Sequence, residues 1–343
     1  MSELEFDGVT LTAFIMSQQQ HVPEATGSFS IMMSAIQLAC KAIATSVRKA
    51  GILGMYGLDG SINVQGEEVK KLDILANNNF ISALKSCMQV ATMVSEENDD
   101  PILVENSEGK YAVVFDPLDG SSNIDCNVSV GSIFGIYLRP DPKAKPSIND
   151  VLQAGSAQIA AGYCMYGSST QLVLTFGKGV HVFTLDPSVG EFLLTQKDLK
   201  IPENPKTIYS INEGNSRTFP PPLIRAVEYF KYQTPKPYSA RYVGSMVSDV
   251  HRTLLYGGWF AYPAAAKEDS KPETWTARNA GKLRTLYEAF PMSLIFENAG
   301  GIGSTGTSRV LDIVPESIHE RTPIVLGCER DMEIVLGEFS KGA

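Results

Sequence analysis

The alternation of helix-like and strand-like segments along the 343-residue chain predicts an α/β protein with mixed helix and sheet layers. A helix is expected over residues 28–50, where apolar side chains recur every three or four positions. A strand is expected over residues 111–115, an apolar, β-branched run. The chain is long enough for two domains, and the proline-containing segment 200–205 predicts a boundary between residues 1–199 and 200–343.

The other elements follow from periodicity and from the placement of glycine and proline. Residues 1–27 are expected to be irregular after Ile15, and residues 264–280 to form an exposed excursion. The strand at 111–115 should end at Pro117, which cannot donate a ladder hydrogen bond. We expect further helices over 71–88, 223–232, 245–256, 282–298 (kinked or divided at Pro291) and 330–339, and further strands over 90–94, 128–138, 158–166, 171–176, 180–185, 191–195, 207–211 and 323–327.

Composition and charge exclude several classes of protein. The net charge of −9 argues against nucleic acid as the main partner, and no apolar run is expected to cross a membrane. The first eight residues carry three acids and no apolar signal region. Five cysteines, no two closer than 38 positions, predict neither a disulfide framework nor a zinc ribbon. These observations predict a reduced, cytoplasmic protein.

The stretch Asp116–Asp125 follows the predicted strand at 111–115 and carries the strongest chemical signal. Asp116 and Asp119 stand just past the carboxyl end of a strand, where ligands bind in open α/β sheets. Gly120 and the two serines after it offer amides and hydroxyls of the kind that bind phosphate. The stretch therefore suggests metal-assisted phosphate chemistry, although Asp-Pro and Asp-Gly pairs are also ordinary turn sequences.

A second acidic pair, Glu96 and Glu97, follows the strand predicted at 90–94. If the two strands are neighbours, four carboxylates converge on one sheet edge and need cations to hold them together. The alternative is a solvated strand end. Gly301–Gly306 matches the dinucleotide fingerprint, but it follows a predicted helix and is interpreted as a glycine-rich helix exit. No nucleophile motif is found, so a metal-activated water is the favoured mechanism, and the four histidines are expected to be structural: His21, His181, His251 and His319.

Four segments in order along the chain carry a family resemblance. They are residues 94–97, 116–125, 240–246 and 281–284, and together they closely resemble class I fructose-1,6-bisphosphatase, of the sugar phosphatase superfamily. The resemblance implies a two-domain fold of alternating helix and sheet layers. Residues 1–199 would form an AMP-regulatory and metal-binding domain, and residues 200–343 a sugar-phosphate-binding domain.

The activity implied by the resemblance is hydrolysis of the 1-phosphate of fructose 1,6-bisphosphate, giving fructose 6-phosphate and phosphate in gluconeogenesis. Two or three Mg²⁺ ions per subunit are implied, with Mn²⁺ as a possible substitute, and Asp73, Glu97 and Glu67 are the implied catalytic residues. Glu67 stands where the family has aspartate, which keeps the charge on a longer arm. The implied metal ligands are Glu96, Glu97, Asp116, the Leu118 carbonyl, Asp119 and Glu288.

Substrate and effector positions carry over in the same way. A homotetramer is implied, in which Arg241 reaches the substrate of a neighbouring subunit. Asn215 stands where the family has a tyrosine near the 6-phosphate. The implied substrate-binding residues are Gly120, Ser121, Ser122, Asn212, Arg241, Tyr242, Gly244, Ser245, Met246, Tyr262, Lys282 and Arg284.

AMP is the implied allosteric inhibitor. The expected contacts are Thr26, Gly27, Ser28, Phe29, Ser30, Lys110, Tyr111 and Arg139. Ser28 and Ser30 replace a glutamate and a threonine of the animal enzymes, and Arg139 stands one position later than the family arginine.

Two other functions remain as alternatives. A related phosphomonoesterase, acting on sedoheptulose 1,7-bisphosphate or inositol monophosphate, would not need Lys282 and Arg241 in this arrangement. A non-catalytic AMP-sensing protein would show a damaged acidic set, whereas every acidic position is filled here.

Overall fold

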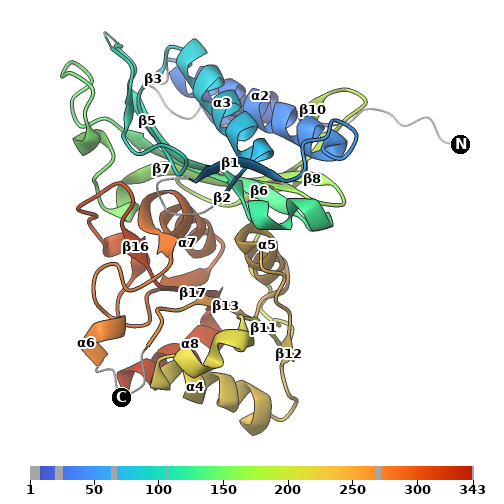
Figure 1. Ribbon diagram of the computed structural model, residues 1–343, viewed down its shortest axis with the longest axis vertical. Helices are drawn as coiled ribbons and strands as arrows, with labels where there is room; N and C mark the ends of the chain where they lie inside the picture. The colour runs from blue at the N-terminus through green and yellow to red at the C-terminus, as the bar shows by residue number, and fades with distance from the viewer. Residues whose placement is uncertain (1–7, 20–25, 63–67, 106, 267–271, 342–343) are drawn as a thin grey trace, which may run out of the picture.

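The computed structural model describes residues 8–19, 26–62, 68–105, 107–266 and 272–341. Helices and sheets alternate in five layers, as Figure 1 shows. This arrangement confirms the predicted mixed α/β class. The outer helix layer contains α2 (Ser28–Lys49) and α3 (Lys71–Ser86), the central one α5 (Met246–Tyr256) and α7 (Phe290–Asn298), and the third α4 (Pro221–Glu228) and α8 (Glu329–Ser340).

An eight-stranded sheet separates the outer from the central helix layer, in the order β10-β9-β8-β7-β6-β5-β3-β4. Within this sheet β3 and β5 pair in parallel, with Ser95 beside Phe115, and the other neighbours are antiparallel. The carboxyl ends of β3 and β5 therefore meet at one edge. The strands are β3 (Val90–Ser95), β4 (Ile102–Leu103), β5 (Tyr111–Asp119), β6 (Val130–Leu138), β7 (Gln158–Tyr166), β8 (Thr170–Thr175), β9 (His181–Asp186) and β10 (Glu191–Gln196).

A five-stranded sheet separates the central from the third helix layer, in the order β12-β11-β13-β17-β15. Its strands are β11 (Ile208–Ser210), β12 (Ser239–Ala240), β13 (Trp259–Tyr262), β15 (Gly301–Ser304) and β17 (Ile324–Cys328). Two small ribbons pair β1 (Leu58–Ile62) with β2 (Glu68–Lys70) and β14 (Leu283–Arg284) with β16 (Arg321–Thr322). The short helices are α1 (Leu11–Gln19), α6 (Pro272–Trp275), η1 (Ser121–Cys126), η2 (Ile148–Asp150), η3 (Gly155–Ala157), η4 (Glu213–Thr218), η7 (Val310–Asp312) and the π-helical η5 (Tyr229–Gln233) and η6 (Thr285–Ala289).

Apolar side chains fill the space between the layers. One cluster lies between α2, α3 and the eight-stranded sheet, and a second between that sheet, α7 and the five-stranded sheet. By length and composition alone α2 could cross a membrane, contrary to expectation. Its buried residues include Met32, Ile36, Cys40 and Ile43, which pack in the first cluster, so a core helix explains the same composition.

The strand β5 does not end at Pro117 as predicted but continues to Asp119. The pairing with β6 shifts its register between Asp116 and Asp119, so the ladder is irregular where proline lacks an N–H group. This irregularity places both aspartates at the sheet edge within the strand itself.

Other sequence predictions were also wrong in detail. α1 is helical within the segment expected to be irregular, and β13 was not predicted. Gly301–Ser304 form a strand rather than a helix exit. The helix expected over 282–298 is divided into β14, η6 and α7, with Pro291 in the first turn of α7. In the expected excursion, Trp275 is buried with Ala264 and Ala266.

Candidate active site

Three elements that are far apart in sequence bring acidic side chains to one point. Asp116 and Asp119 come from β5, and Glu288 comes from η6 at the entrance to α7. All three are buried, and each offers a carboxylate oxygen within 4.8 Å of the others. Glu96 and Glu97 follow the neighbouring strand β3, and Glu96 is also buried. The convergence expected from two adjacent strand ends is present in the structure.

Local hydrogen bonds orient these carboxylates. The Asp116 Oδ1 atom accepts the backbone N–H of Leu118 at 2.9 Å, and Asp119 Oδ2 accepts that of Val247 at 2.9 Å. Val247 lies in the first turn of α5, so the positive end of the helix faces Asp119. The Glu288 carboxylate accepts the backbone N–H of Arg284 at 2.6 Å.

Burial and mutual repulsion disfavour the charged forms of these acids. Burial first, and then the charge of Glu96, raise the pKa of Asp116 and of Glu288 well above the ordinary range. Burial raises the pKa of Asp119 to about 7, although the hydrogen bond from the Val247 N–H lowers it. One cation of the chain, Arg284, reaches Glu96 at 3.1 Å. The donor set of carboxylate oxygens suits Mg²⁺ or Mn²⁺, which would offset the remaining repulsion.

A turn suited to phosphate lies directly after Asp119. Gly120 adopts a left-handed conformation with φ of 75°, and Ser121 and Ser122 begin the short helix η1 without a side-chain cap. A Cβ atom on Gly120 would lie 2.9 Å from the Ser245 hydroxyl, so a larger residue is strained in backbone and in contacts. Asp73 of α3 faces Ser121, and burial raises the pKa of Asp73 to about 7.

A cavity of about 170 Å³ connects these features. Tyr242 and Tyr262 lie close together in its wall, and burial raises the pKa of Tyr242 to about 12. The predicted residues that line the cavity are Asp73, Glu96, Glu97, Asp116, Leu118, Asp119, Gly120, Ser121, Ser122, Tyr242, Gly244, Met246, Tyr262, Lys282, Arg284 and Glu288.

Four residues of the predicted catalytic, metal-binding and substrate-binding set are not among the cavity-lining residues. Asn212 is exposed and caps η4, where its side chain accepts the Gly214 N–H at 3.1 Å. Arg241 is exposed, and its guanidinium donates to the carbonyl of Ala240. Ser245 is buried behind Gly120. Glu67 lies outside the described residues.

Asp249 lines the same cavity but was not predicted from the sequence. Its carboxylate accepts the backbone N–H groups of Val243 and Gly244, at 2.8 and 2.9 Å, and the Ser210 hydroxyl at 2.9 Å. These bonds fix the turn that carries Tyr242 and Gly244. A single aspartate inside a helix gave no signal of this role.

Comparison with known proteins decides the family. Residues 9–197 match the family model described as Fructose-1-6-bisphosphatase, N-terminal domain, and residues 201–338 match that of the C-terminal domain. The chain belongs to the fructose-1,6-bisphosphatase family. The resemblance seen in four short segments is thereby confirmed over nearly the whole chain.

Relatives and solved structures agree with this family. The chain is 53% identical to the cytosolic fructose-1,6-bisphosphatase of Arabidopsis thaliana over 340 residues, covering 98% of this chain and 96% of that protein. It is also 53% identical to the Solanum tuberosum protein of the same name over 330 residues, covering 95% and 94%. The holo form of Leishmania major fructose-1,6-bisphosphatase superposes with a TM-score of 0.89 at 41% identity, covering 97% of this chain and 99% of that one. The T-state structure of the Leishmania protein gives 0.83 at 40% identity, covering 96% and 98%.

The predicted effector residues of this fructose-1,6-bisphosphatase family member lie partly together, at the N-terminal end of α2. Gly27 is left-handed with φ of 80° and supplies no side-chain cap to the helix. The Thr26 and Ser28 hydroxyls are 2.9 Å apart, and Ser30 accepts a hydrogen bond from Gln19. The ring of Phe29 packs edge-on against Tyr111 of β5, with 6.2 Å between centroids. Lys110 precedes Tyr111 and is exposed.

Arg139 does not join this group. Its Nε atom donates to Asp150 at 3.0 Å, and its Nη atoms donate to the carbonyls of Gly109, Pro142 and Ala144. The guanidinium is fully buried in the ion pair with Asp150. This arrangement contradicts the predicted contact of Arg139 with AMP, because all three of its nitrogen atoms are already engaged.

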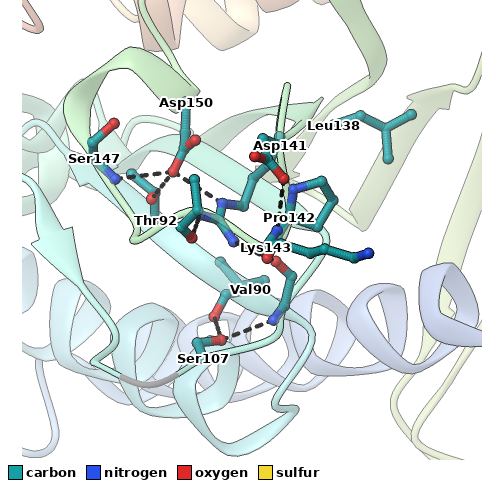
Figure 2. A network of polar contacts seen from close by, with 12 residues as sticks. Val90, Thr92, Ser107, Leu138, Asp141, Pro142, Lys143, Ser147 and Asp150 are labelled. Atoms are coloured by element: carbon teal, nitrogen blue, oxygen red, sulfur yellow. Dashed lines mark hydrogen bonds and ion pairs between the residues drawn. The ribbon is translucent and has the colours of Figure 1, made fainter.

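The alternation of side chains along β6 is the physical reason. Leu138 lies directly opposite Tyr111 in the ladder, so both point to the face covered by α2. The next residue points to the other face, where Figure 2 shows Thr92 and the Ser147 N–H converging on Asp150, with Leu138 away from them. The α2 face therefore presents a half-exposed leucine at the position where the resemblance implies an arginine.

Proposed function

We propose that this protein hydrolyses the 1-phosphate of fructose 1,6-bisphosphate to fructose 6-phosphate and phosphate in gluconeogenesis. The observation that carries the proposal is one cavity that combines a buried acidic cluster, the turn at Gly120 and the lysine Lys282. A cation-binding end and a phosphate-binding end in one cavity suit a sugar with two phosphates. The relatives named cytosolic support the same compartment here.

Asp116, Asp119, Glu288, Glu96 and Glu97, with the Leu118 carbonyl, would hold two or three Mg²⁺ or Mn²⁺ ions. Bound there, such ions supply charge stabilisation of an in-line displacement at phosphorus. The protein's own part is to fix the oxygens, through the ladder between β3 and β5 and the hydrogen bonds described above. Repulsion among the buried acids favours cation binding.

Asp73 is the group best placed to accept a proton from the attacking water. It is buried, it faces Ser121 at the phosphate-binding turn, and its pKa of about 7 matches a base working near neutral pH. Glu97 and Glu67 would assist it. Ser121 and Ser122 would donate hydrogen bonds to the non-bridging oxygens of the phosphoryl group, which carry negative charge while the bond to the sugar oxygen breaks.

The second phosphate and the sugar would bind across the cavity from the acids. Lys282 supplies positive charge, and Tyr242 and Tyr262 supply hydroxyl donors. Gly244, Met246 and Arg284 would line the sugar path, with Ser245 behind Gly120, and Asn212 would contact the substrate from outside the lining described here. Arg241 is exposed and would serve a neighbouring subunit of a homotetramer. We assign the metal centre, apart from Glu288, to a domain of residues 1–199, and the sugar site to a domain of residues 200–343, which also contributes Glu288.

AMP would act at the N-terminal end of α2. The helix dipole and the uncapped N–H groups favour phosphate, and Lys110 and Tyr111 lie at the start of β5. Thr26, Gly27, Ser28, Phe29 and Ser30 would form the rest of the site, without Arg139.

Phosphate release measured on three substrates tests the proposal. Fructose 1,6-bisphosphate should be hydrolysed in Mg²⁺, the activity should disappear with EDTA, and Mg²⁺ should restore it. Inositol 1-phosphate and sedoheptulose 1,7-bisphosphate should be poorer substrates. Activity that survives EDTA, or a preference for inositol 1-phosphate, would contradict the proposal.

A further inference from the structure

A chain of polar contacts connects three elements that contribute residues to the acidic cavity, namely α3, the turn after β3 and η6. It begins on α3, whose residue Asn77 lies one turn after Asp73 on the same side of the helix. It continues through the turn after β3 that carries Glu96 and Glu97. It ends at Tyr287, the residue before Glu288 on η6.

The α3 side of the turn is held by Asn77. The Asn77 amide accepts the buried Ser95 hydroxyl at 2.8 Å and donates to the Asn98 side chain at 2.9 Å. The Ser95 hydroxyl in turn accepts the backbone N–H of Glu97 at 3.3 Å. Both ends of the turn from 95 to 98 are therefore tied to one amide group.

The opposite side of the turn is held by His319. Its Nε2 atom lies 3.0 Å from the Asn98 carbonyl and 3.3 Å from that of Asp99, while Nδ1 lies 2.8 Å from the Tyr287 hydroxyl. Carbonyl oxygens only accept hydrogen bonds, so Nε2 must carry the proton. Burial lowers the pKa of His319, which favours the neutral ring, in which Nδ1 accepts the phenol proton of Tyr287.

The segment that carries His319 is itself anchored. Glu320 is buried, and its carboxylate accepts hydrogen bonds from the Arg278 guanidinium at 2.6 Å and from the backbone N–H of Glu316 at 2.9 Å. Its carbonyl accepts the N–H of Thr285 at 2.7 Å, in the first residue of η6. The imidazole therefore extends from a fixed support next to Glu288 and reaches the turn that carries Glu97.

We propose that His319 is a positioning residue of the metal centre, which fixes the Glu96–Glu97 turn relative to Glu288 through the carbonyls of Asn98 and Asp99. The inference rests on the proposed metal centre. Cation binding needs oxygens from β5, from η6 and from this turn at fixed separations. Groups that orient metal ligands from behind typically change metal affinity 10- to 100-fold when removed.

Two substitutions distinguish the contribution of the Nε2 atom of His319 from that of its Nδ1 atom. In His319→Gln the amide nitrogen stands near the position of Nε2 and can donate to the Asn98 carbonyl. In His319→Asn the shorter side chain keeps a polar group near Nδ1 and Tyr287 but no longer reaches the carbonyl. Both variants carry the same uncharged amide group and neither is larger than histidine, so they differ only in how far the amide reaches.

Mn²⁺ binding to the unliganded full chain, measured by calorimetry, is the direct readout. The asparagine variant should bind Mn²⁺ roughly 10-fold more weakly than wild type and need correspondingly more Mg²⁺ for half-maximal activity, while the glutamine variant stays within about 2-fold. The KM for fructose 1,6-bisphosphate at saturating Mg²⁺ should change little. Equal Mn²⁺ affinity of wild type and His319→Asn, or equal losses in both variants, would overturn the inference.

Melting temperatures in EDTA show whether each variant folds, and one further variant completes the test. Should His319→Asn fail to fold, Tyr287→Phe removes only the bond that orients the ring and should weaken Mn²⁺ binding about 2- to 3-fold; unchanged affinity there would also contradict the role of His319. A wild-type protein that binds no Mn²⁺ would contradict the proposed metal centre instead. The two failures are thus distinguishable.

Discussion

The acidic cavity and the N-terminal end of α2 differ in how completely the structure assembles their predicted residues. In the cavity, carboxylates from β3, β5 and η6 meet around one point. At α2, Phe29 and Tyr111 come together, but Arg139 points to the opposite face of the sheet. The acidic cavity is assembled as predicted because its side chains follow the ends of two paired strands. At α2, a shift of one residue along β6 moves the arginine side chain to the opposite face of the sheet.

The largest expected effect tests the catalytic side of this comparison. Asp119→Asn should abolish turnover, with a loss on the order of 10³-fold or more, because a charged group that we propose as a cation ligand is replaced by a neutral one. The amide oxygen can still accept the Val247 N–H, so the fold should be retained. Phosphate release and circular dichroism measure the two outcomes. The partly exposed Asp186, at the end of β9, changed to asparagine, is the control and should leave activity unchanged.

The second prediction concerns the acidic cluster without metal. The pKa of Asp119 is raised to about 7 in the folded state, so the folded protein binds more protons than the unfolded chain between about pH 4 and pH 7. Stability in EDTA should therefore fall as pH rises through this window, by several degrees in melting temperature.

Mg²⁺ should reverse that loss, because it binds the folded state only. Melting curves between pH 5 and pH 8, with EDTA or Mg²⁺, provide the measurement. Asp119→Asn should show a shallower decline with pH than wild type. A melting temperature that rises over this range in EDTA would show that the acids are not held in the environment described here.

Most of the acidic cluster could be predicted from the sequence, because its residues follow strands that the local sequence identifies. Glu96, Glu97, Asp116 and Asp119 each follow or end a recognisable strand, and parallel pairing brings those ends together. Glu288 could be reached only through the family resemblance, since its position depends on how η6 packs against β5.

Other features could not be predicted because tertiary pairing decides them. Gly301–Ser304 resemble a glycine-rich loop, yet pairing with β17 makes them a strand. Pro117 was expected to stop β5, but the register shift near Asp119 accommodates it. The buried position of Arg139 depends on Asp150, a partner 11 residues away that periodicity does not reveal.

A smaller effect is expected at the substrate-positioning turn. Asp249→Asn replaces an acceptor-only carboxylate by an amide whose NH₂ group must face the N–H of Val243 or of Gly244. The turn that carries Tyr242 should loosen, raising the KM for fructose 1,6-bisphosphate roughly 10-fold. Steady-state kinetics at saturating Mg²⁺ tests this. The Asp186→Asn control, whose carboxylate accepts hydrogen bonds from Ser188 in its own turn, should change KM by less than about 2-fold.

The smallest expected effect, in Leu138→Arg, tests the regulatory side. Leu138 is half-exposed and stands opposite Tyr111 on the face covered by α2, so an arginine there would bring a guanidinium beside the N-terminal end of that helix. AMP should then inhibit at roughly 3- to 10-fold lower concentration, the gain expected from one partly exposed charged hydrogen bond. The kcat without AMP should be unchanged. Inhibition curves for wild type, Leu138→Arg and the exposed-turn control Val189→Arg give the comparison. If Leu138→Arg and wild type respond equally to AMP, the nucleotide does not bind on this face, and the contrast between the two regions would then rest on the catalytic cavity alone.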